Sequence, residues 1–122
     1  MHPFPPASEL QFLSGLEVGQ ICLDPWSTQF RFSDGGQITI EGPFEYLDTE
    51  GQTHFHQSAD AQDRGPVHFR DLIQRRITSV ESEPLRLTLG FDTGAKLSIM
   101  GEIGPYESGQ ISPPSGHPLI VF

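Results

Sequence analysis

Hydrophobic and polar residues alternate along the stretch from Phe30 to Ile40, and Asp34, Gly35 and Gly36 interrupt the alternation. In a β-strand, successive side chains point to opposite faces, so the apolar positions on both sides of the break share one face. Glycine supplies the positive φ angles that a tight turn requires. The pattern therefore predicts a β-hairpin with one buried face.

The same layout returns in residues 87–99. The step from Phe32 to Ile38 in the first hairpin equals the step from Phe91 to Leu97 in the second. We interpret the two stretches as one β unit that the chain uses twice. This interpretation predicts that Phe32 and Phe91 occupy equivalent buried positions.

Ahead of each hairpin, an apolar pair has the same spacing in sequence. The pair is Leu16 and Ile21 in the first half and Leu72 and Ile77 in the second. The length of 122 residues is that of one domain. We therefore predict a single β domain over residues 15–122, with repeat units at about 16–56 and 72–108. Residues 1–14 are rich in proline, and we expect a flexible arm there that docks through Phe4 or Phe12.

Further strands are predicted at residues 44–47, 52–56 and 118–122. Residues 66–76 are the one helix candidate, because Phe69, Leu72 and Ile73 share a face at helical spacing. The predicted fold class is all-β with one short helix: two similar antiparallel units, related by a pseudo-twofold axis, forming a sandwich or a partly open barrel. Strand edges in such a repeat invite pairing, so we expect a symmetric homodimer.

The formal net charge of −9 argues against nucleic-acid binding, which needs a basic surface. The charge permits a basic protein partner, and a solvated surface accounts for it as well. No apolar run reaches the length of a membrane span, and the first residues lack the features of a signal peptide. Cys22 is the single cysteine, which excludes an intrachain disulfide. We expect a cytoplasmic protein in which Cys22 is a buried structural thiol.

His54 and His56 stand two residues apart on a predicted strand, so their side chains point to the same side and are able to chelate a metal ion. A zinc site needs a third ligand, for which His68 and Asp60 are the candidates. Two solvated histidines on a surface strand are the simpler interpretation. The sequence contains no nucleophile turn and no phosphate-binding glycine loop, so we expect no catalytic residues and no cofactor.

The remaining candidate binding residues are one aromatic residue and a group of acids: Trp26, and Glu41, Glu45, Asp48 and Glu50. Trp26 follows a proline in a predicted turn, where it either anchors an interface or packs over the hairpin. The four acids lie close together in sequence, along a predicted strand and its turn. We expect this region to be the first to contact a basic partner.

The closing third of the chain resembles a family of small bacterial all-β proteins of unknown function. The family has a hairpin with an Asp-Gly turn, then a Tyr-Glu-x-Trp motif and a Pro-Gly-Gly turn. Residues 87–99, 106–108 and 114–116 carry the likeness here. Gly109 stands where the family has tryptophan, and Ser115 replaces the first glycine of the second motif.

Some members of that family resemble immunity proteins of bacterial contact-dependent toxin systems. The resemblance implies a non-enzymatic protein-binding domain, an immunity-type inhibitor of a basic partner. The alternative function is a small metal-binding domain or metal-dependent enzyme that uses His54 and His56. A structural module that associates with itself through an edge strand is the third hypothesis.

Overall fold

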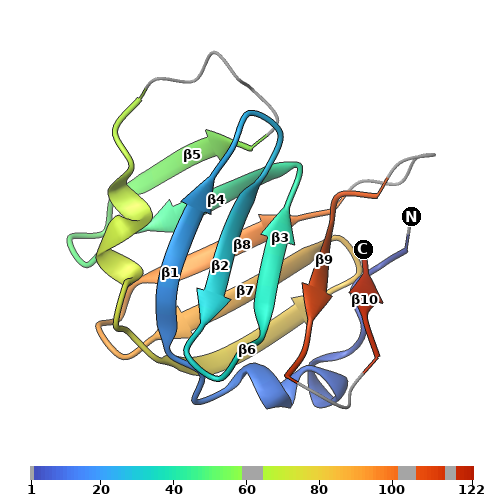
Figure 1. Ribbon diagram of the computed structural model, residues 1–122. Coiled ribbons are helices and arrows are strands. Elements are labelled where there is room, and N and C mark those ends of the chain that lie inside the picture. Colours follow the sequence, from blue (N-terminus) through green and yellow to red (C-terminus); the bar gives the residue numbers. More distant parts are fainter. Residues whose placement is uncertain (1, 59–64, 102–106, 115–117) are drawn as a thin grey trace.

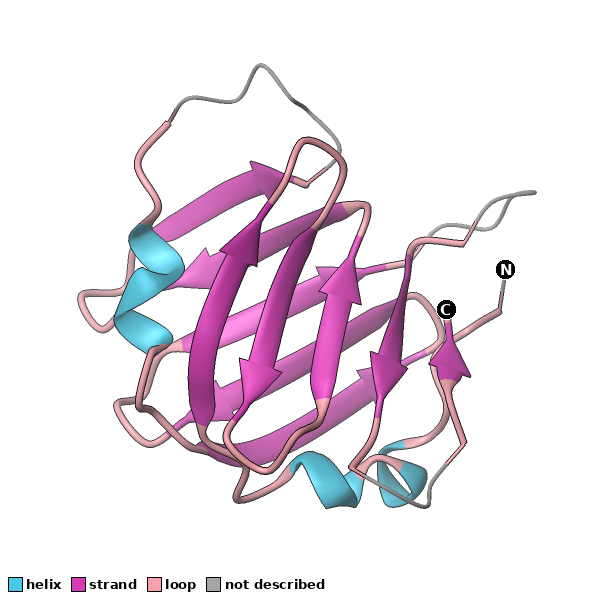
Figure 2. Ribbon diagram, viewed as in Figure 1, coloured by secondary structure: helices cyan, strands magenta, loops and turns pink. Residues whose placement is uncertain are grey.

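The computed structural model describes residues 2–58, 65–101, 107–114 and 118–122, which form two antiparallel five-stranded sheets packed face to face (Figure 1). The first sheet has the strand order β1-β2-β3-β9-β10: Val18–Leu23, Thr28–Phe32, Gln37–Ile40, Gly109–Ser112 and Ile120–Val121. The second has the order β5-β4-β8-β7-β6: Thr53–Gln57, Pro43–Leu47, Lys96–Met100, Arg86–Phe91 and Ile77–Glu83. Three short 3-10 helices complete the described chain (Figure 2): η1 (Ala7–Glu9), η2 (Gln11–Leu13) and η3 (His68–Leu72). The sheets do not close into a barrel, so the predicted all-β class is confirmed and the architecture is a sandwich.

The two predicted hairpins are β2–β3 and β7–β8, and they occupy equivalent places in the two sheets. Val18 pairs with Phe32 as Ile77 pairs with Phe91, so the halves match at an offset of 59 residues. The strand before each hairpin has an irregularity at the matching point, directly after Val18 and directly after Ile77. The amides of Phe32 and Phe91 close their turns with bonds of 2.8 and 2.9 Å. The agreement in register supports the internal repeat.

Each sheet combines three strands of one half with two strands of the other. β4 and β5 extend the second sheet beside β8, while β9 and β10 extend the first sheet beside β3. A Cβ atom on Gly109, at the start of β9, would overlap the Thr39 carbonyl and the Phe122 ring. This close approach explains why β9 has a glycine at the position where β4 has Phe44.

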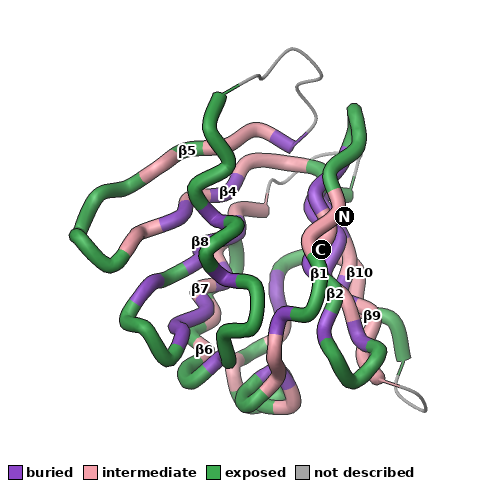
Figure 3. Tube along the Cα trace, turned by 60° about the vertical axis from the view of Figure 1, so that its left-hand side comes forward, coloured by how far each residue is buried: buried purple, intermediate pink, exposed green. Residues whose placement is uncertain are grey.

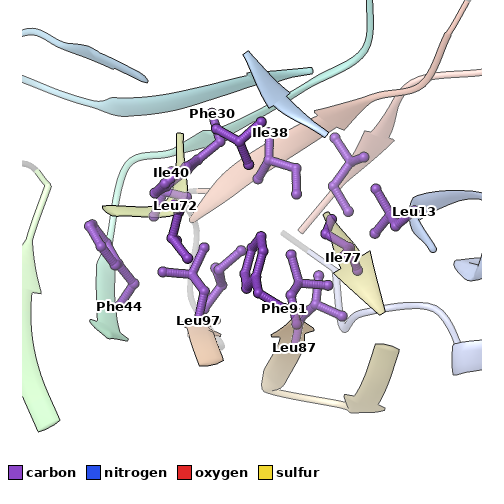
Figure 4. Close-up of a cluster of buried hydrophobic side chains, with 14 of the residues drawn as sticks. Leu13, Phe30, Ile38, Ile40, Phe44, Leu72, Ile77, Leu87, Phe91 and Leu97 are labelled. Atoms are coloured by element: carbon purple, nitrogen blue, oxygen red, sulfur yellow. The ribbon is translucent and has the colours of Figure 1, made fainter. Parts of the chain in front are cut away.

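The apolar faces of the two sheets form one core (Figures 3 and 4). Phe32 and Phe91 are 6% and 4% exposed, which confirms that they are equivalent buried residues. Phe69 of η3 contacts Phe30 of the first sheet and Phe44 of the second, with ring centroids 5.8 and 5.1 Å apart. η3 therefore covers one side of the sandwich by packing against both sheets.

The N-terminal arm is docked on the core through Phe4, one of the two expected anchors, and its packing extends further than predicted. Phe4, Leu10 and Leu13 are buried in the core, and the Phe4 ring lies 4.5 Å from that of Phe122. The amide of Phe4 also donates to the carbonyl of Pro84 at 2.9 Å. Two 3-10 turns with a proline-rich lead-in carry neither helical nor strand periodicity, so the sequence pattern did not predict the burial of Leu10 and Leu13.

The predicted helix over residues 66–76 is wrong in extent, because η3 has only five residues and is a 3-10 helix. Phe69 and Leu72 are buried as expected, but Ile73 is 37% exposed. The helical turn ends at Leu72, because Ile73 is already extended, with a ψ angle of 130°, and Gln74 follows with a φ angle of +70°. Its amide donates to the carbonyl of Val18 at 2.7 Å and ties the segment to β1.

The predicted match ahead of the hairpins is shifted by three residues. The sequence spacing equates Leu16 with Leu72, whereas the register equates Leu13 with Leu72. Both of these leucines end a 3-10 helix and are buried. Each is followed two residues later by a residue with positive φ: Gly15 at +92° and Gln74 at +70°.

Sequence reasoning missed β9, because Gly109–Ser112 contains one strongly apolar residue, Ile111. The last strand is also shorter than predicted, at Ile120–Val121. Cys22 is half-buried on the outer face of the first sheet beside Gln29, so the predicted buried thiol is wrong.

Candidate functional site

The turn between β1 and β2 presents Trp26 to solvent, with 69% of the residue exposed. Asp24 shapes this turn. Its carboxylate accepts bonds from the amides of Trp26 and Ser27 at 2.8 and 2.7 Å, and from the Ser27 hydroxyl at 2.8 Å. These donors, the Trp26 amide foremost, hold the pKa of Asp24 below its ordinary value. Of the two predicted roles for Trp26, packing over the hairpin is therefore excluded.

Three acidic residues lie at the same end of the first sheet as Trp26. Asp24 lies in the turn itself, and Glu41 follows β3, the strand that pairs with β2. The amide of Glu41 donates to the carbonyl of Ser108 at 2.9 Å, which brings Glu107 to the same end. Asp24, Glu41 and Glu107 are all exposed. We call these three acids together with Trp26 the Trp26 end.

The fold separates the four acids that were expected to form one region. Glu41 precedes β4, whereas Asp48 and Glu50 follow it, so they lie at opposite ends of the strand. Glu45 lies on β4 and pairs with Arg86 at 3.0 Å. Only Glu41 of the four contributes to the Trp26 end.

His54 is held by its neighbours on the inner side of β5. Its Nε2–H donates to the carboxylate of Asp48 at 2.9 Å, and its ring stacks on that of His68 with centroids 3.8 Å apart. The bond from His54, followed by the amides of Gln52 and Glu50, holds the pKa of Asp48 below its ordinary value. His54 therefore fixes the turn between β4 and β5.

Tyr46 lies opposite His54 on β4, and its ring also stacks with the histidine ring at 6.1 Å. Burial raises the pKa of the Tyr46 phenol, and the carboxylates of Asp71 and Asp48 add to the effect. The phenol is therefore kept protonated and acts as part of the core rather than as a base.

His56 points to the same side of β5 as His54, as the strand spacing predicts. Its ring stacks on Phe44 at 5.2 Å and meets the edge of Phe69 at 4.7 Å. The interpretation of the two histidines as solvated surface groups is therefore wrong, since both are partly buried among aromatic rings.

A cavity of about 100 Å³ opens beside His56, between the end of β1 and the segment that leads into η3. Leu23, Asp24 and Val67 line its mouth. Pockets that hold drug-sized ligands usually measure about 300–1,000 Å³. This cavity is much smaller, so the corner suits contact with a side chain better than capture of a metabolite.

The metal hypothesis requires a third ligand near His54 and His56. Over the described ranges, no three side chains of histidine, cysteine, aspartate or glutamate are grouped so that they could hold an ion. His68 does approach His54, but stacked imidazoles have their lone pairs in parallel planes, and these do not converge on one point. Asp60, the other candidate, lies outside the described residues.

Comparisons with protein-family models, with curated proteins and with solved structures found no match to this chain. In the part of the chain that the structure describes, no helix has the length and apolar character needed to cross a membrane. Three positions behind the resemblance to bacterial all-β proteins, Tyr106, Ser115 and Gly116, lie outside the described residues.

Sequence reasoning identified Trp26 and Glu41 but missed three of their neighbours: Leu23, Val67 and Glu107. Leu23 is the last residue of β1 and is 54% exposed, although it reads as an interior position. Val67 and Glu107 are brought to this corner by pairings between distant segments. Of the features of this site, only the turn with proline and tryptophan could be recognised from residues adjacent in sequence.

Proposed function

We propose that this chain is a non-enzymatic protein-binding domain whose Trp26 end contacts a basic protein. The observation that carries the proposal is the 69% exposure of Trp26 on a turn that Asp24 holds in place. A turn whose backbone is already held in place loses little conformational freedom on binding, and tryptophan is enriched among residues that dominate binding energy.

Apolar and charged neighbours support a protein as the ligand. Leu23 and Val67 are 54% and 38% exposed and line the small cavity together with Asp24, which gives an apolar centre beside the turn that carries Trp26. Asp24, Glu41 and Glu107 place negative charge around that centre. An apolar centre with a charged rim is the usual composition of a protein interface, and the sign of this rim favours a basic partner.

The resemblance of the closing third to immunity-type proteins agrees with this proposal and adds a role. An acidic inhibitor that covers the basic nucleic-acid-binding surface of a toxin would need an anionic rim of this kind. Inhibition of a toxin is the form of the proposal that the resemblance favours.

The test begins with capture of partners from a native lysate on wild-type protein, followed by binding of the purified partner to variants. Trp26→Ala is expected to weaken binding at least tenfold while leaving the urea midpoint unchanged, because the exposed indole contributes little to the core. Leu119→Ala is the matched control, since Leu119 is also exposed, at 54%, and lies on the opposite side of the first sheet from Trp26.

Equal affinity of the wild type and Trp26→Ala for the purified partner would refute the assignment of the Trp26 end. An acidic partner, or turnover of a small-molecule substrate by the pure protein, would refute the proposed function itself.

A further inference from the structure

β5 is an edge strand, and no described strand lies beyond it in the second sheet (Figure 1). It runs without a bulge through five consecutive pairs with β4, from Thr53 to Gln57. The amides of Asp48 and Ser58 donate to the carbonyls of Gln52 and Gly42 across the same hairpin.

These bonds determine which backbone groups face outward, because hydrogen-bonded and non-hydrogen-bonded pairs alternate in an antiparallel ladder. Gln52, His54, His56 and Ser58 direct their amides and carbonyls toward β4. The amides and carbonyls of Thr53, Phe55 and Gln57 therefore point away from the sheet. β5 thus offers an evenly spaced row of donors and acceptors centred on Phe55.

The other three edges are protected. The N-terminal arm lies along β6, where Ser82 donates to the carbonyl of Pro5 at 2.6 Å, and β6 is also bulged. β1 is bulged as well and is covered at its start by the bond from the amide of Val18 to Arg75 at 3.0 Å. β10 has only two residues and follows Pro118 closely. β5 has no bulge and no proline, and none of the described residues covers its outer edge in this way.

The side chains of β5 also suit contact with an identical strand. The strand contains no acidic or basic residue other than its two inward histidines, in a chain of net charge −9. Phe55, at its centre, is 60% exposed on the outer face of the sheet (Figure 3 shows the exposure along β5). In an antiparallel pair, the acidic turns that contain Asp48 and Glu50 lie at opposite ends, so their repulsion is small.

We propose that β5 pairs with β5 of a second copy of this chain, about a twofold axis at Phe55, so that the second sheets of the two copies form one continuous sheet. In this register Phe55 exchanges both backbone bonds with its counterpart, and Thr53 does so with Gln57 of the second copy. The two Phe55 rings lie side by side on the outer face and remove each other from water. The interface does not use the Trp26 end.

Molecular mass in solution is the first test. Light scattering on the eluted protein should give twice the chain mass of 13.5 kDa at high micromolar concentration. Phe55→Lys places two like charges on the axis and should give a monomer, because charge on an edge strand opposes pairing. Leu119→Lys, which makes the same change at the β10 edge, should remain a dimer. A monomeric wild type, or a Phe55→Lys dimer, would overturn the proposal.

Disulfide trapping tests the register itself, in a Cys22→Ser background. Opposed residues of a hydrogen-bonded pair have Cα atoms about 5.5 Å apart, within disulfide range. Thr53→Cys combined with Gln57→Cys should therefore yield a covalent dimer on mild oxidation. Thr53→Cys alone should not, since its counterpart lies about 13 Å along the strand at roughly 3.3 Å per residue. Efficient trapping of that single variant, or none of the double variant, would contradict the register.

Discussion

Glu17 and Arg76 face each other across the axis that relates the two halves of the fold. They form an isolated antiparallel bridge, and the Arg76 guanidinium lies 3.4 Å from the Glu17 carboxylate. Two backbone bonds of 2.7 Å flank the pair symmetrically: Gly15 amide to Ile77 carbonyl, and Gln74 amide to Val18 carbonyl. The pseudo-twofold axis therefore passes through the contact that joins the two sheets at this edge.

Gly15 and Gln74 are equivalent about that axis, and both have positive φ. An L side chain in this conformation costs about 1–2 kcal/mol, a cost that glycine avoids. Gln74→Gly is thus expected to stabilise the protein by up to about 1 kcal/mol, and Gly15→Ala to destabilise it by about 1 kcal/mol. Space is not the cause at Gly15, because no atom lies within 4 Å of a Cβ placed there. Urea midpoints of the two variants that shift in the same direction would contradict the equivalence.

Removing the buried ring of Phe32 or of its repeat equivalent Phe91 should destabilise the fold to a similar extent. Phe32→Ala and Phe91→Ala are each expected to cost about 3–5 kcal/mol, the usual range for a buried phenylalanine. Phe55→Ala is the control, and because its side chain is exposed, its effect on the unfolding of the isolated chain should stay within about 0.5 kcal/mol. The comparison needs urea unfolding at a concentration low enough to keep the wild type and all three variants monomeric. An unchanged midpoint for Phe32→Ala would refute its place in the core.

Acid should weaken the fold through Asp48. Its pKa in the folded protein is below the ordinary value of 3.8, so its charged form stabilises the fold above that pH. The stabilisation is lost as the pH falls through the folded-state pKa. Asp48→Asn should therefore be less stable than the wild type at neutral pH, and the two should converge below pH 3.8.

The control for this titration is Asp92→Asn, which removes a carboxylate from an exposed turn position. Urea midpoints measured from neutral pH downward separate the two effects. A difference between wild type and Asp48→Asn that is the same at every pH would show that the carboxylate charge is not responsible.

Purified protein that has never carried a histidine tag is expected to contain no stoichiometric zinc or other transition metal. The reason is that His54 Nε2 already donates to Asp48 and that the His54 and His68 rings stack. Elemental analysis checks this directly. About one metal ion per chain, lost in His54→Ala, would instead support the metal-binding alternative.

The sequence predicted the structure correctly where one face of a strand is buried and the other is exposed to solvent. Phe30 to Ile40 and its repeat have this property, so hairpins, repeat and fold class could all be predicted. The strand Gly109–Ser112 could not be predicted, because it forms by pairing with β3 of the other half and has no alternation of apolar and polar residues of its own. How the arm packs beyond Phe4 could not be predicted for a related reason, since Phe4 lies against Phe122 near the other end of the chain and the two 3-10 helices lie against β6 of the other half.

The candidate site followed the same division. Trp26 was found because proline and aspartate set a turn locally. The four acids were wrongly grouped, because residues close in sequence lie far apart when an extended strand runs between them. Glu41 and Asp48 stand at the two ends of β4, about 23 Å apart at roughly 3.3 Å per residue. Glu107 lies at the same end of the sheet as Trp26 only because β9 pairs with β3.

The kinetics of association with the captured partner, measured at several salt concentrations, test whether the Trp26 end attracts a basic surface. If the Trp26 end attracts a basic surface, the association rate should fall steeply with salt while dissociation changes little, since exposed charges are screened beyond about 8 Å at physiological ionic strength. Glu41→Gln with Glu107→Gln should lower the association rate and flatten its salt dependence, whereas Glu81→Gln with Glu83→Gln on β6 should not. An association rate that ignores salt, or that is the same in both double variants, would contradict the account.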